Sequence, residues 1–204
     1  SSAQTIDANS PTVSSATVTG GTKKIGDAFT ITVAADAAGY TLSSGTMNGI
    51  AVSGFSDEGG GSYEVTYTVV EGHTDRTAGN TPISIVLADA AGNTNSAHTS
   101  LTESSALVID ANKPAATTSA TVAGSTAKIG DAITVTIVAS EAGLSCSSCT
   151  MNGVALTGFA LSSGTTYTAT YTVVEGHTDR AAGATTLSIT LTDAAGNSNS
   201  AFTT

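Results

Sequence analysis

An internal repeat constrains the fold of this chain more than any other feature. The ten residues from Tyr67 to Arg76 return unchanged from Tyr171 to Arg180, and three shorter motifs return at the same distance of 104 residues. These are Ile25-Gly-Asp27 with Ile129-Gly-Asp131, Thr46-Met-Asn-Gly49 with Thr150-Met-Asn-Gly153, and Asp89-Ala-Ala-Gly-Asn93 with Asp193-Ala-Ala-Gly-Asn197. Self-similarity at a fixed period marks repeated structural units. Because 204 residues fit two domains of about 100 residues, we expect one domain in residues 1–108 and a second copy in residues 109–204.

Apolar residues alternate with polar ones in each copy, as they do in half-buried strands. In the first copy the apolar positions are Phe29, Ile31 and Val33, then Tyr63, Val65, Tyr67 and Val69, then Ile83, Ile85 and Leu87. Asn48-Gly49 and Asn152-Gly153 are hairpin-turn dipeptides, since both positions accept positive φ. Helical periodicity is absent. Short strands with frequent turns indicate an all-β sandwich of antiparallel strands.

The pattern predicts seven strands in the first copy, and the second copy follows 104 residues later. The expected ranges are 11–19, 27–35, 46–48, 50–55, 62–70, 82–88 and 96–108.

The charge of the chain excludes several kinds of partner. Six basic residues face sixteen acidic ones, for a net charge of −10. Nucleic acids and anionic membranes both require basic patches, so we expect neither as a partner. No apolar run is long enough to span a bilayer, and no signal peptide stands at the start. No nucleophile elbow, phosphate loop or dinucleotide fingerprint occurs, so the sequence predicts a protein that is not an enzyme.

Several of these motifs resemble the Ig-like repeats of large prokaryotic cell-surface proteins, such as adhesins, biofilm proteins and surface-layer proteins. They are Gly-Asp before the strand at 27–35, Tyr-Thr-Val-Val-Glu-Gly from Tyr67, and Asp-Ala-Ala-Gly-Asn from Asp89. The resemblance covers both copies. It implies two tandem Ig-like antiparallel β-sandwich domains, an extracellular location at the cell surface, head-to-tail neighbours of the same repeat, and calcium where domains meet.

The segment that joins the copies is loosely similar to a cadherin linker. It reads Asp110-Ala-Asn112-Lys-Pro114, and the loop that precedes it carries Glu71 and the pair Asp75-Arg76. The second aspartate of a cadherin linker is missing, and no Asp-x-Asp motif occurs in the second copy. The resemblance therefore implies one ion per junction rather than a cluster of ions.

Acidic residues fall at the two ends of an Ig-like sandwich. Hard cations such as Ca²⁺ take six to eight oxygen ligands, and this mixture of carboxylates and amides suits calcium better than zinc. We expect the metal ligands to be Asp27, Glu71 and Asp75 from the exit end of the first copy, with Asp110, Asn112, Glu141, Asp193 and Asn197 from the entry end of the second. The other two ends repeat these sets, with Asp7, Asn9, Asp36, Asp89 and Asn93, and with Asp131, Glu175 and Asp179.

Metal-free interpretations of the same residues remain open. Asp27 and Asp131 follow glycine at the start of a strand, where aspartate commonly makes a turn. The loop at Asp89 is a good turn by itself, because glycine accepts left-handed geometry. Asp75-Arg76 is also compatible with an ordinary surface ion pair. We expect His73 and His177 to face solvent, and four acids without counterparts to be solvated, namely Asp57, Glu58, Glu64 and Glu103.

The only cysteines are Cys146 and Cys149, in a Ser/Gly-rich stretch of the second copy. A lone C-x-x-C lacks the second ligand pair of a zinc site and the βαβ setting of a redox motif. We expect a local loop disulfide that closes a small ring and constrains little.

The sequence thus predicts an elongated structural spacer or filament repeat that calcium stiffens. The alternatives are an adhesive module for a glycan or partner protein, with Tyr40, Phe55 and Phe159 as its few aromatic candidates, and an accessory domain of a hydrolase. Residues 1–7 resemble 104–110, and Phe202-Thr-Thr204 aligns with His98-Thr-Ser100. We therefore expect either a window from a longer array or subunits in which one N-terminus completes a neighbour's last strand.

Overall fold

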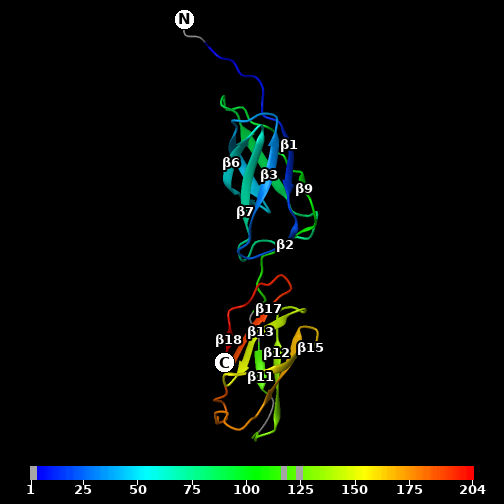
Figure 1. Ribbon diagram of the computed structural model, residues 1–204, viewed down its shortest axis with the longest axis vertical. Helices are drawn as coiled ribbons and strands as arrows, with labels where there is room; N and C mark the ends of the chain where they lie inside the picture. Colours follow the sequence, from blue (N-terminus) through cyan, green and yellow to red (C-terminus); the bar gives the residue numbers. More distant parts are fainter. Residues whose placement is uncertain (1–3, 116–118, 123–125) are drawn as a thin grey trace. The chain divides into compact units, whose positions relative to one another are not determined.

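The computed structural model describes residues 4–115, 119–122 and 126–204, which divide into the compact units Ser1–Asn112 and Lys113–Thr204 (Figure 1). The division falls after Asn112 rather than after residue 108. The reason is that strand β10 (Leu107–Asp110) pairs with the first unit, and Ile109 and Ala111 are buried in its core. Both units consist of strands and loops, with no helix among the described residues.

The first sandwich is built from two main sheets and one two-stranded sheet. One main sheet has the order β6 (Ser53–Gly59), β7 (Ser62–Thr68), β3 (Ala28–Ala35), β1 (Val13–Val18) and β9 (Leu101–Glu103). The other has the order β5 (Ile50–Ala51), β4 (Thr41–Met47) and β8 (Ile83–Ala88). In the small sheet, β10 runs parallel to β2 (Gly21–Lys24), and β9 likewise runs parallel to β1. The first and last strands of this sandwich therefore lie side by side.

The core of the first sandwich comes from the alternating positions predicted from the sequence. Along β7 the buried residues are Tyr63, Val65 and Tyr67, while Glu64 and Thr66 are half-buried between them. The rings of Phe29 and Tyr67 meet edge to face with their centroids 5.5 Å apart. Full burial of an apolar side chain of this size stabilises a fold by about 1.5–3 kcal/mol. The period-two pattern thus selected the residues that hold the sheets together.

The second sandwich repeats this layout. One sheet has the order β11 (Ser119–Val122), β12 (Ala132–Val138), β16 (Thr166–Thr172) and β15 (Thr157–Ser163). The other has the order β14 (Val154–Ala155), β13 (Ser145–Met151), β17 (Leu187–Thr192) and β18 (Phe202–Thr203). The hairpin turns at Asn48 and Asn152 have φ of 54° and 52°, as the Asn-Gly dipeptides predict. The predicted all-β, Ig-like sandwich fold is confirmed.

Three expected strands differ from the structure. The strand expected at 50–55 is divided into β5 and β6, which belong to different sheets. The strand expected at 46–48 is the longer β4, in which a bulge between Leu42 and Ser44 interrupts the side-chain alternation that would have revealed it. The strand expected at 96–108 is divided into β9 and β10. Asn95 Oδ1 accepts a hydrogen bond from the Leu87 amide at 2.6 Å. Within residues 96–100, His98 alone forms a β-bridge to β8, at Ile85. The chain next crosses Gly20 so closely that a side chain there would meet the carbonyl group of Ser105.

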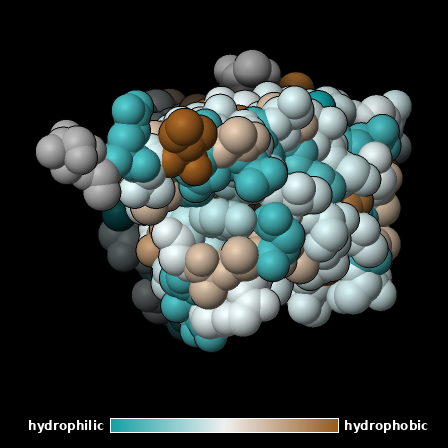
Figure 2. Space-filling view, turned by 90° about the horizontal axis from the view of Figure 1, so that it is seen from above, coloured by the Kyte–Doolittle hydropathy of each residue, from teal (hydrophilic) through white to brown (hydrophobic). Residues whose placement is uncertain are grey.

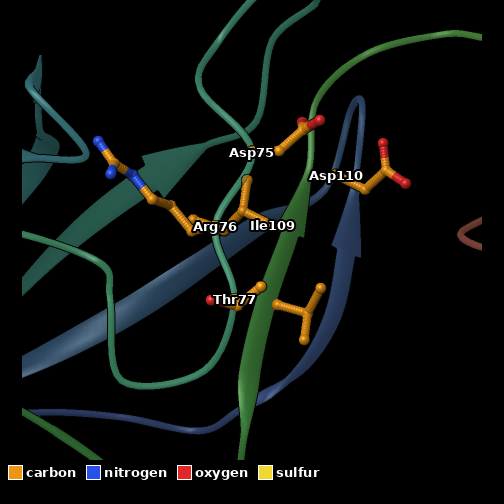
Figure 3. A pocket seen from close by; sticks show the side chains of 6 residues that line it. Asp75, Arg76, Thr77, Ile109 and Asp110 are labelled. Atoms are coloured by element: carbon orange, nitrogen blue, oxygen red, sulfur yellow. The ribbon is translucent and has the colours of Figure 1, made fainter.

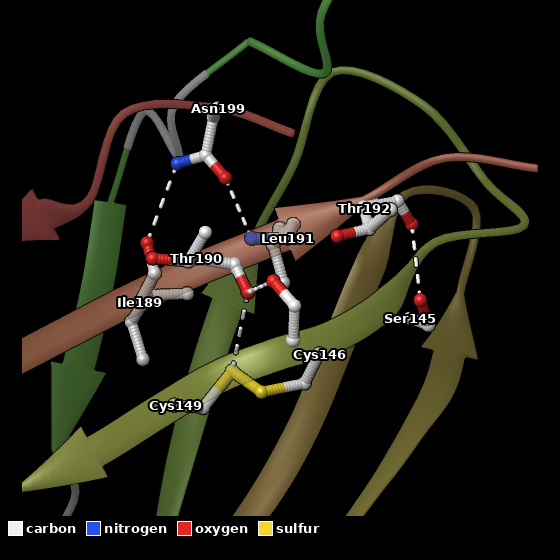
Figure 4. The surroundings of a disulfide bond; sticks show 9 residues. Ser145, Cys146, Cys149, Ile189, Thr190, Leu191, Thr192 and Asn199 are labelled. Carbon is white, nitrogen blue, oxygen red and sulfur yellow. Dashed lines mark hydrogen bonds between the residues drawn. A yellow bond between two sulfur atoms is a disulfide. The ribbon is translucent and has the colours of Figure 1, made fainter. Parts of the chain in front are cut away.

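The disulfide between Cys146 and Cys149 lies in strand β13 rather than in a loop, which corrects the expectation from its Ser/Gly-rich surroundings (Figure 4). Cys149 is 5% exposed and belongs to the core of the second sandwich. Leu42 and Gly45 hold the matching positions in the first copy, where a methyl group on Gly45 would lie 3.2 Å from the Leu42 side chain. The disulfide therefore occupies the position at which, in the first copy, the Leu42 side chain packs against Gly45.

Candidate functional site at the sandwich ends

The entry end of the first sandwich has two contacts between segments that are distant in the sequence. The Thr12 amide donates to Asp36 Oδ1 at 2.8 Å, and the Asp36 amide donates back to the Thr12 carbonyl group. Asn93 Nδ2 donates to the Asp7 carbonyl oxygen at 3.4 Å. The Thr12 amide lowers the pKa of Asp36 below its usual value. Here Asp36 fastens the incoming strand to the sandwich.

At the exit end, the loop between β7 and β8 (residues 69–82, hereafter the exit loop) holds the outgoing chain. Asp75 Oδ1 accepts hydrogen bonds from the Ala111 amide at 2.7 Å and from Asn112 Nδ2 at 2.9 Å. The Gly72 amide donates to the Ala111 carbonyl oxygen at 2.9 Å. Ala111 is fully buried. The outgoing chain is therefore fixed to the first sandwich as far as Asn112.

A shallow depression of about 210 Å³ lies between the exit loop and β10 (Figure 3). Arg76 and Ile109 face each other across it and exchange two backbone hydrogen bonds, each 2.9 Å long. In Figure 3, the side chains of Asp75 and Asp110 both lie near the end of β10. Its remaining lining residues are Thr77 and Val108. Pockets that bind small-molecule ligands usually measure about 300–1,000 Å³. This depression is smaller, and its walls are the exit loop and the strand β10 that the loop holds in place.

Two of the acids considered as ligands, Asp27 and Asp131, bind the backbone of their own loops. Asp27 Oδ2 accepts the Lys24 amide at 2.9 Å, which is the turn role left open by the sequence. Asp131 does the same with the Lys128 amide and also pairs with Lys128 Nζ at 3.1 Å, and both contacts lower its pKa. Within the described ranges, no group of three His, Cys, Asp or Glu side chains is placed to hold a metal ion.

The predicted set is also distributed over both units. Asp27, Glu71, Asp75, Asp110 and Asn112 belong to the first unit, whereas Glu141, Asp193 and Asn197 belong to the second. Glu71, Asp110, Glu141 and Asn197 each have interaction partners in the structure. Calcium at this set remains a prediction.

The repeated loops at Asp89 and Asp193 differ in the hydrogen bonding of one carboxylate oxygen, Oδ2, and this difference bears on cation binding. Asp89 Oδ2 accepts Asn93 Nδ2 at 2.9 Å, and this bond is the main cause of the lowered pKa of Asp89. In the second copy, Asp193 Oδ1 accepts the amides of Gly196 and Asn197. Asp193 Oδ2, however, is buried and has no hydrogen-bond partner. An unpaired buried carboxylate oxygen is costly, so this position is suited to a cation.

The two exit-loop histidines do not face solvent freely, contrary to the sequence-based expectation. His73 is half-buried, and its Nδ1 lies 2.8 Å from the Tyr67 hydroxyl and accepts the Val70 amide at 3.3 Å. His177 makes the same two contacts with Tyr171 and Val174. Nδ1 of each histidine is therefore already engaged by two groups. This arrangement leaves Nδ1 unavailable to a metal in either copy.

Sequence reasoning missed the side chain that organises the exit loop. Asn48, at the hairpin turn, is 5% exposed. Its Nδ2 donates to the Thr74 carbonyl oxygen at 2.7 Å and to the Tyr67 hydroxyl at 3.2 Å, and its Oδ1 accepts Arg76 Nε at 2.6 Å. The turn dipeptide explained this asparagine by backbone conformation alone, so nothing in the pattern indicated a second role.

Two acids expected to be solvated also bind loops. Glu103 accepts the amides of Gly79 at 3.0 Å and Leu107 at 2.9 Å. Asp57 accepts the amides of Gly39 and Gly59 at 2.7 and 2.9 Å. Leu161 stands at the position that matches Asp57, so repetition within the chain gave no indication of the role of Asp57.

The aromatic side chains that an adhesive surface would need pack against the core instead. Phe55 stacks on Tyr63 with the ring centroids 5.4 Å apart, and Phe159 stacks on Tyr167 at 4.8 Å. Tyr40 also stacks on Tyr63, with the ring centroids 6.2 Å apart. On the face shown in Figure 2, hydrophobic residues are scattered singly among polar and small ones. No observation therefore favours the adhesive interpretation.

Residues 110–204 match the model of a family described as a bacterial Ig-like domain. This range corresponds to the second repeat, and the internal repeat extends the likeness to the first copy. No curated protein matches the sequence. Among the residues that the structure describes, no helix is long and apolar enough to cross a membrane.

Solved structures with tandem β-sandwiches are similar to this chain at low identity. The fibronectin(III)-like modules of Clostridium thermocellum CbhA are 13% identical over 95% of this chain and 90% of that one, with a TM-score of 0.35. The I9–I11 tandem of titin is 10% identical over 93% and 64%, with a TM-score of 0.33. The first eight Ig domains of Down Syndrome Cell Adhesion Molecule are 15% identical over 95% and 27%, with a TM-score of 0.43.

Proposed function

We propose that this chain is a non-catalytic spacer segment of a bacterial cell-surface protein, in which Ig-like repeats follow one another head to tail and carry tension. The match of the second repeat to bacterial Ig-like domains supports this proposal, since such domains are commonly found in extracellular or surface proteins. The observation that carries it is the parallel pairing of the first and last strands in the first sandwich, β1 with β9 and β2 with β10.

Tension applied at the two ends of such a sandwich acts along its paired terminal strands. In a parallel pair the strands must slide past each other, so several hydrogen bonds are loaded together rather than one at a time. The exit loop adds to this resistance because Arg76 and Asp75 hold Ile109 and Ala111 from the other side. This arrangement suits a domain that must keep its fold while it transmits force.

Single-molecule pulling on the 204-residue chain tests the proposal. We expect two unfolding events, one for each sandwich. Ser104→Pro removes the amide that donates to the Val18 carbonyl oxygen at 2.9 Å and should lower the unfolding force of the first sandwich alone, so the second sandwich is the internal control. Unfolding forces that do not change with Ser104→Pro would contradict the proposal.

Calcium is the ion we propose to stiffen the array, with Asp193 as the central ligand on the second sandwich. The support is the buried Asp193 Oδ2 without a partner, together with the preference of Ca²⁺ for carboxylate and carbonyl oxygens. Asp89, whose second oxygen is already bonded to Asn93, provides the matched control.

Calorimetric titration with Ca²⁺ and thermal melting with a chelator test this part separately. Calcium should raise the melting temperature of the second sandwich. Asp193→Asn should abolish that increase, whereas Asp89→Asn should leave it intact. Melting that is identical with and without calcium would remove calcium from the proposal and leave the mechanical role standing.

A further inference from the structure

The chain contains two Asn-Gly dipeptides, Asn48-Gly49 and Asn152-Gly153. In an Asn-Gly pair the backbone nitrogen of the second residue can approach the side-chain carbonyl carbon of the first, because glycine has no side chain to hinder it. Both pairs lie at the same hairpin turn of their sandwich, with φ of 54° at Asn48 and 52° at Asn152. The two backbones are thus alike, and the pairs differ in the contacts of the asparagine side chains.

The side chain of Asn48 is held at both of its polar atoms. Its Nδ2 donates to the Thr74 carbonyl oxygen at 2.7 Å and to the Tyr67 hydroxyl at 3.2 Å, and its Oδ1 accepts Arg76 Nε at 2.6 Å. Asn48 is also buried, at 5% exposed. These contacts must break before the side chain can turn toward the Gly49 amide.

The side chain of Asn152 is held differently. Its Oδ1 accepts the Thr186 amide at 3.3 Å, which is its one side-chain hydrogen bond among the residues that the structure describes. The matching residue of the first copy is Pro82, and proline has no amide to donate. This substitution within the repeat explains why Asn152 binds Thr186 whereas Asn48 binds the exit loop.

The surroundings of Asn152 suit attack on its side-chain carbonyl group. A donor at Oδ1 stabilises the negative charge that develops on this oxygen when a nucleophile adds to the carbon. In the described part of the second sandwich, the Gly153 amide makes no backbone hydrogen bond, and a Cβ on Gly153 would meet nothing within 4 Å. The turn also closes on the two-residue strand β14 at the edge of its sheet. The nucleophile is therefore available and lies in open space.

We propose that Asn152-Gly153 is a site at which the second sandwich modifies itself by deamidation. The Gly153 nitrogen adds to Asn152 Cγ, the proton of the Gly153 amide passes to Nδ2, and ammonia leaves, so that a succinimide ring forms. Water then opens the ring at either of its carbonyl carbons and yields aspartate or isoaspartate. The reaction consumes water, releases ammonia, and needs neither an oxidant nor a cofactor.

Either product places a negative charge in a part of the chain that has none, since no charged residue occurs between Glu141 and Glu175. Isoaspartate also adds a methylene group to the main chain of the turn between β13 and β14, which pair at Thr150 with Ala155 and at Met151 with Val154. The modification goes beyond the spacer function, because it changes the charge and one edge of the second sandwich irreversibly with age.

Incubation of the full 204-residue chain at mildly alkaline pH, followed by peptide mapping, tests the site. Cleavage after lysine and arginine places the two dipeptides in separate peptides, residues 25–76 and 129–180. Deamidation at Asn152 should be at least about tenfold faster than at Asn48, whose buried hydrogen bonds must break first. In urea the two rates should become equal, because both asparagines lie in the sequence Thr-Met-Asn-Gly.

Two reciprocal substitutions test the cause of the difference. Thr186→Pro removes the amide donor of the second copy and should slow the modification of Asn152, whereas Pro82→Thr supplies a donor in the first copy and should accelerate that of Asn48. Each new residue already stands at this position in the other copy, so both variants should fold. Equal rates in the native chain, an unmodified Asn152, or rates that neither substitution changes would overturn the proposal.

Discussion

Asp75 accepts the backbone amide of Ala111 at 2.7 Å, through the same carboxylate oxygen that accepts the side-chain amide of Asn112. The two partners are 36 residues apart in the sequence. Their contact makes the chain that leaves the first sandwich part of that sandwich. A residue proposed from the sequence as a calcium ligand therefore has a structural role that needs no ion.

The network around Asn48 should contribute more stability than its counterpart in the second copy. Asn48→Gly keeps the positive φ but removes three side-chain hydrogen bonds. Loss of buried partners should destabilise the first sandwich by about 2 kcal/mol. Asn152→Gly removes, among the residues that the structure describes, one side-chain bond, from the Thr186 amide at 3.3 Å, and should cost less. Chemical denaturation of both variants compares them, and equal losses would contradict this account of the network.

The disulfide should be replaceable by the pair found in the first copy. Reduction should lower the stability of the second sandwich by at most about 2 kcal/mol, as expected for a very small ring, and should not unfold it. The double variant Cys146→Leu/Cys149→Gly should restore most of the loss, because Leu42 and Gly45 pack at the same bulge. Melting curves of the oxidised, reduced and double-variant chains provide the comparison. A double variant less stable than the reduced chain would show that the two sites are not equivalent.

Acid should destabilise both sandwiches below about pH 4. The pKa values of Asp36, Asp89 and Asp131 are lowered from 3.8 by the amides and side chains that they accept. The unfolded chain therefore takes up protons before the folded chain does, so the stability from these groups is complete above pH 3.8 and is lost as the pH falls through the folded pKa values.

Melting temperatures measured from neutral pH to about pH 2.5 test this dependence. Asp89→Asn should flatten the acid limb for the first sandwich, because one of the titrating groups is removed. Asp57→Asn is a suitable comparison, as it changes an acid of the same sandwich outside this set. A melting temperature that does not change down to the lowest pH would contradict the assignment.

The sequence predicted those parts of the fold that depend on local alternation and turn chemistry. Tyr63, Val65 and Tyr67 were identified as core residues because each strand position has one buried face, and Asn48-Gly49 was identified as a turn because its backbone geometry needs those residues. The path of the last strands could not be predicted in this way. It depends on the close approach of Ser105 to Gly20, which is a contact between distant segments.

The roles of the acids at the ends of the sandwich could not be predicted from the sequence. Asp27, Asp36 and Asp75 each bind a backbone amide, and a count of carboxylates cannot distinguish such a bond from a metal ligand. Comparison of the two copies gave no indication of the role of Asp57, which accepts the amides of Gly39 and Gly59 in the first copy and is matched by Leu161 in the second.

Amide hydrogen exchange at Ala111 tests most directly whether the exit loop holds the outgoing chain. This amide should be protected from exchange in the native chain. Asp75→Ala should accelerate its exchange at least about tenfold, as expected for loss of a hydrogen bond to a charged group. Asp179→Ala, the same substitution in the second copy, should leave Ala111 unchanged. Exchange at the rate of an unstructured peptide in the native chain, or protection that survives Asp75→Ala, would contradict the account.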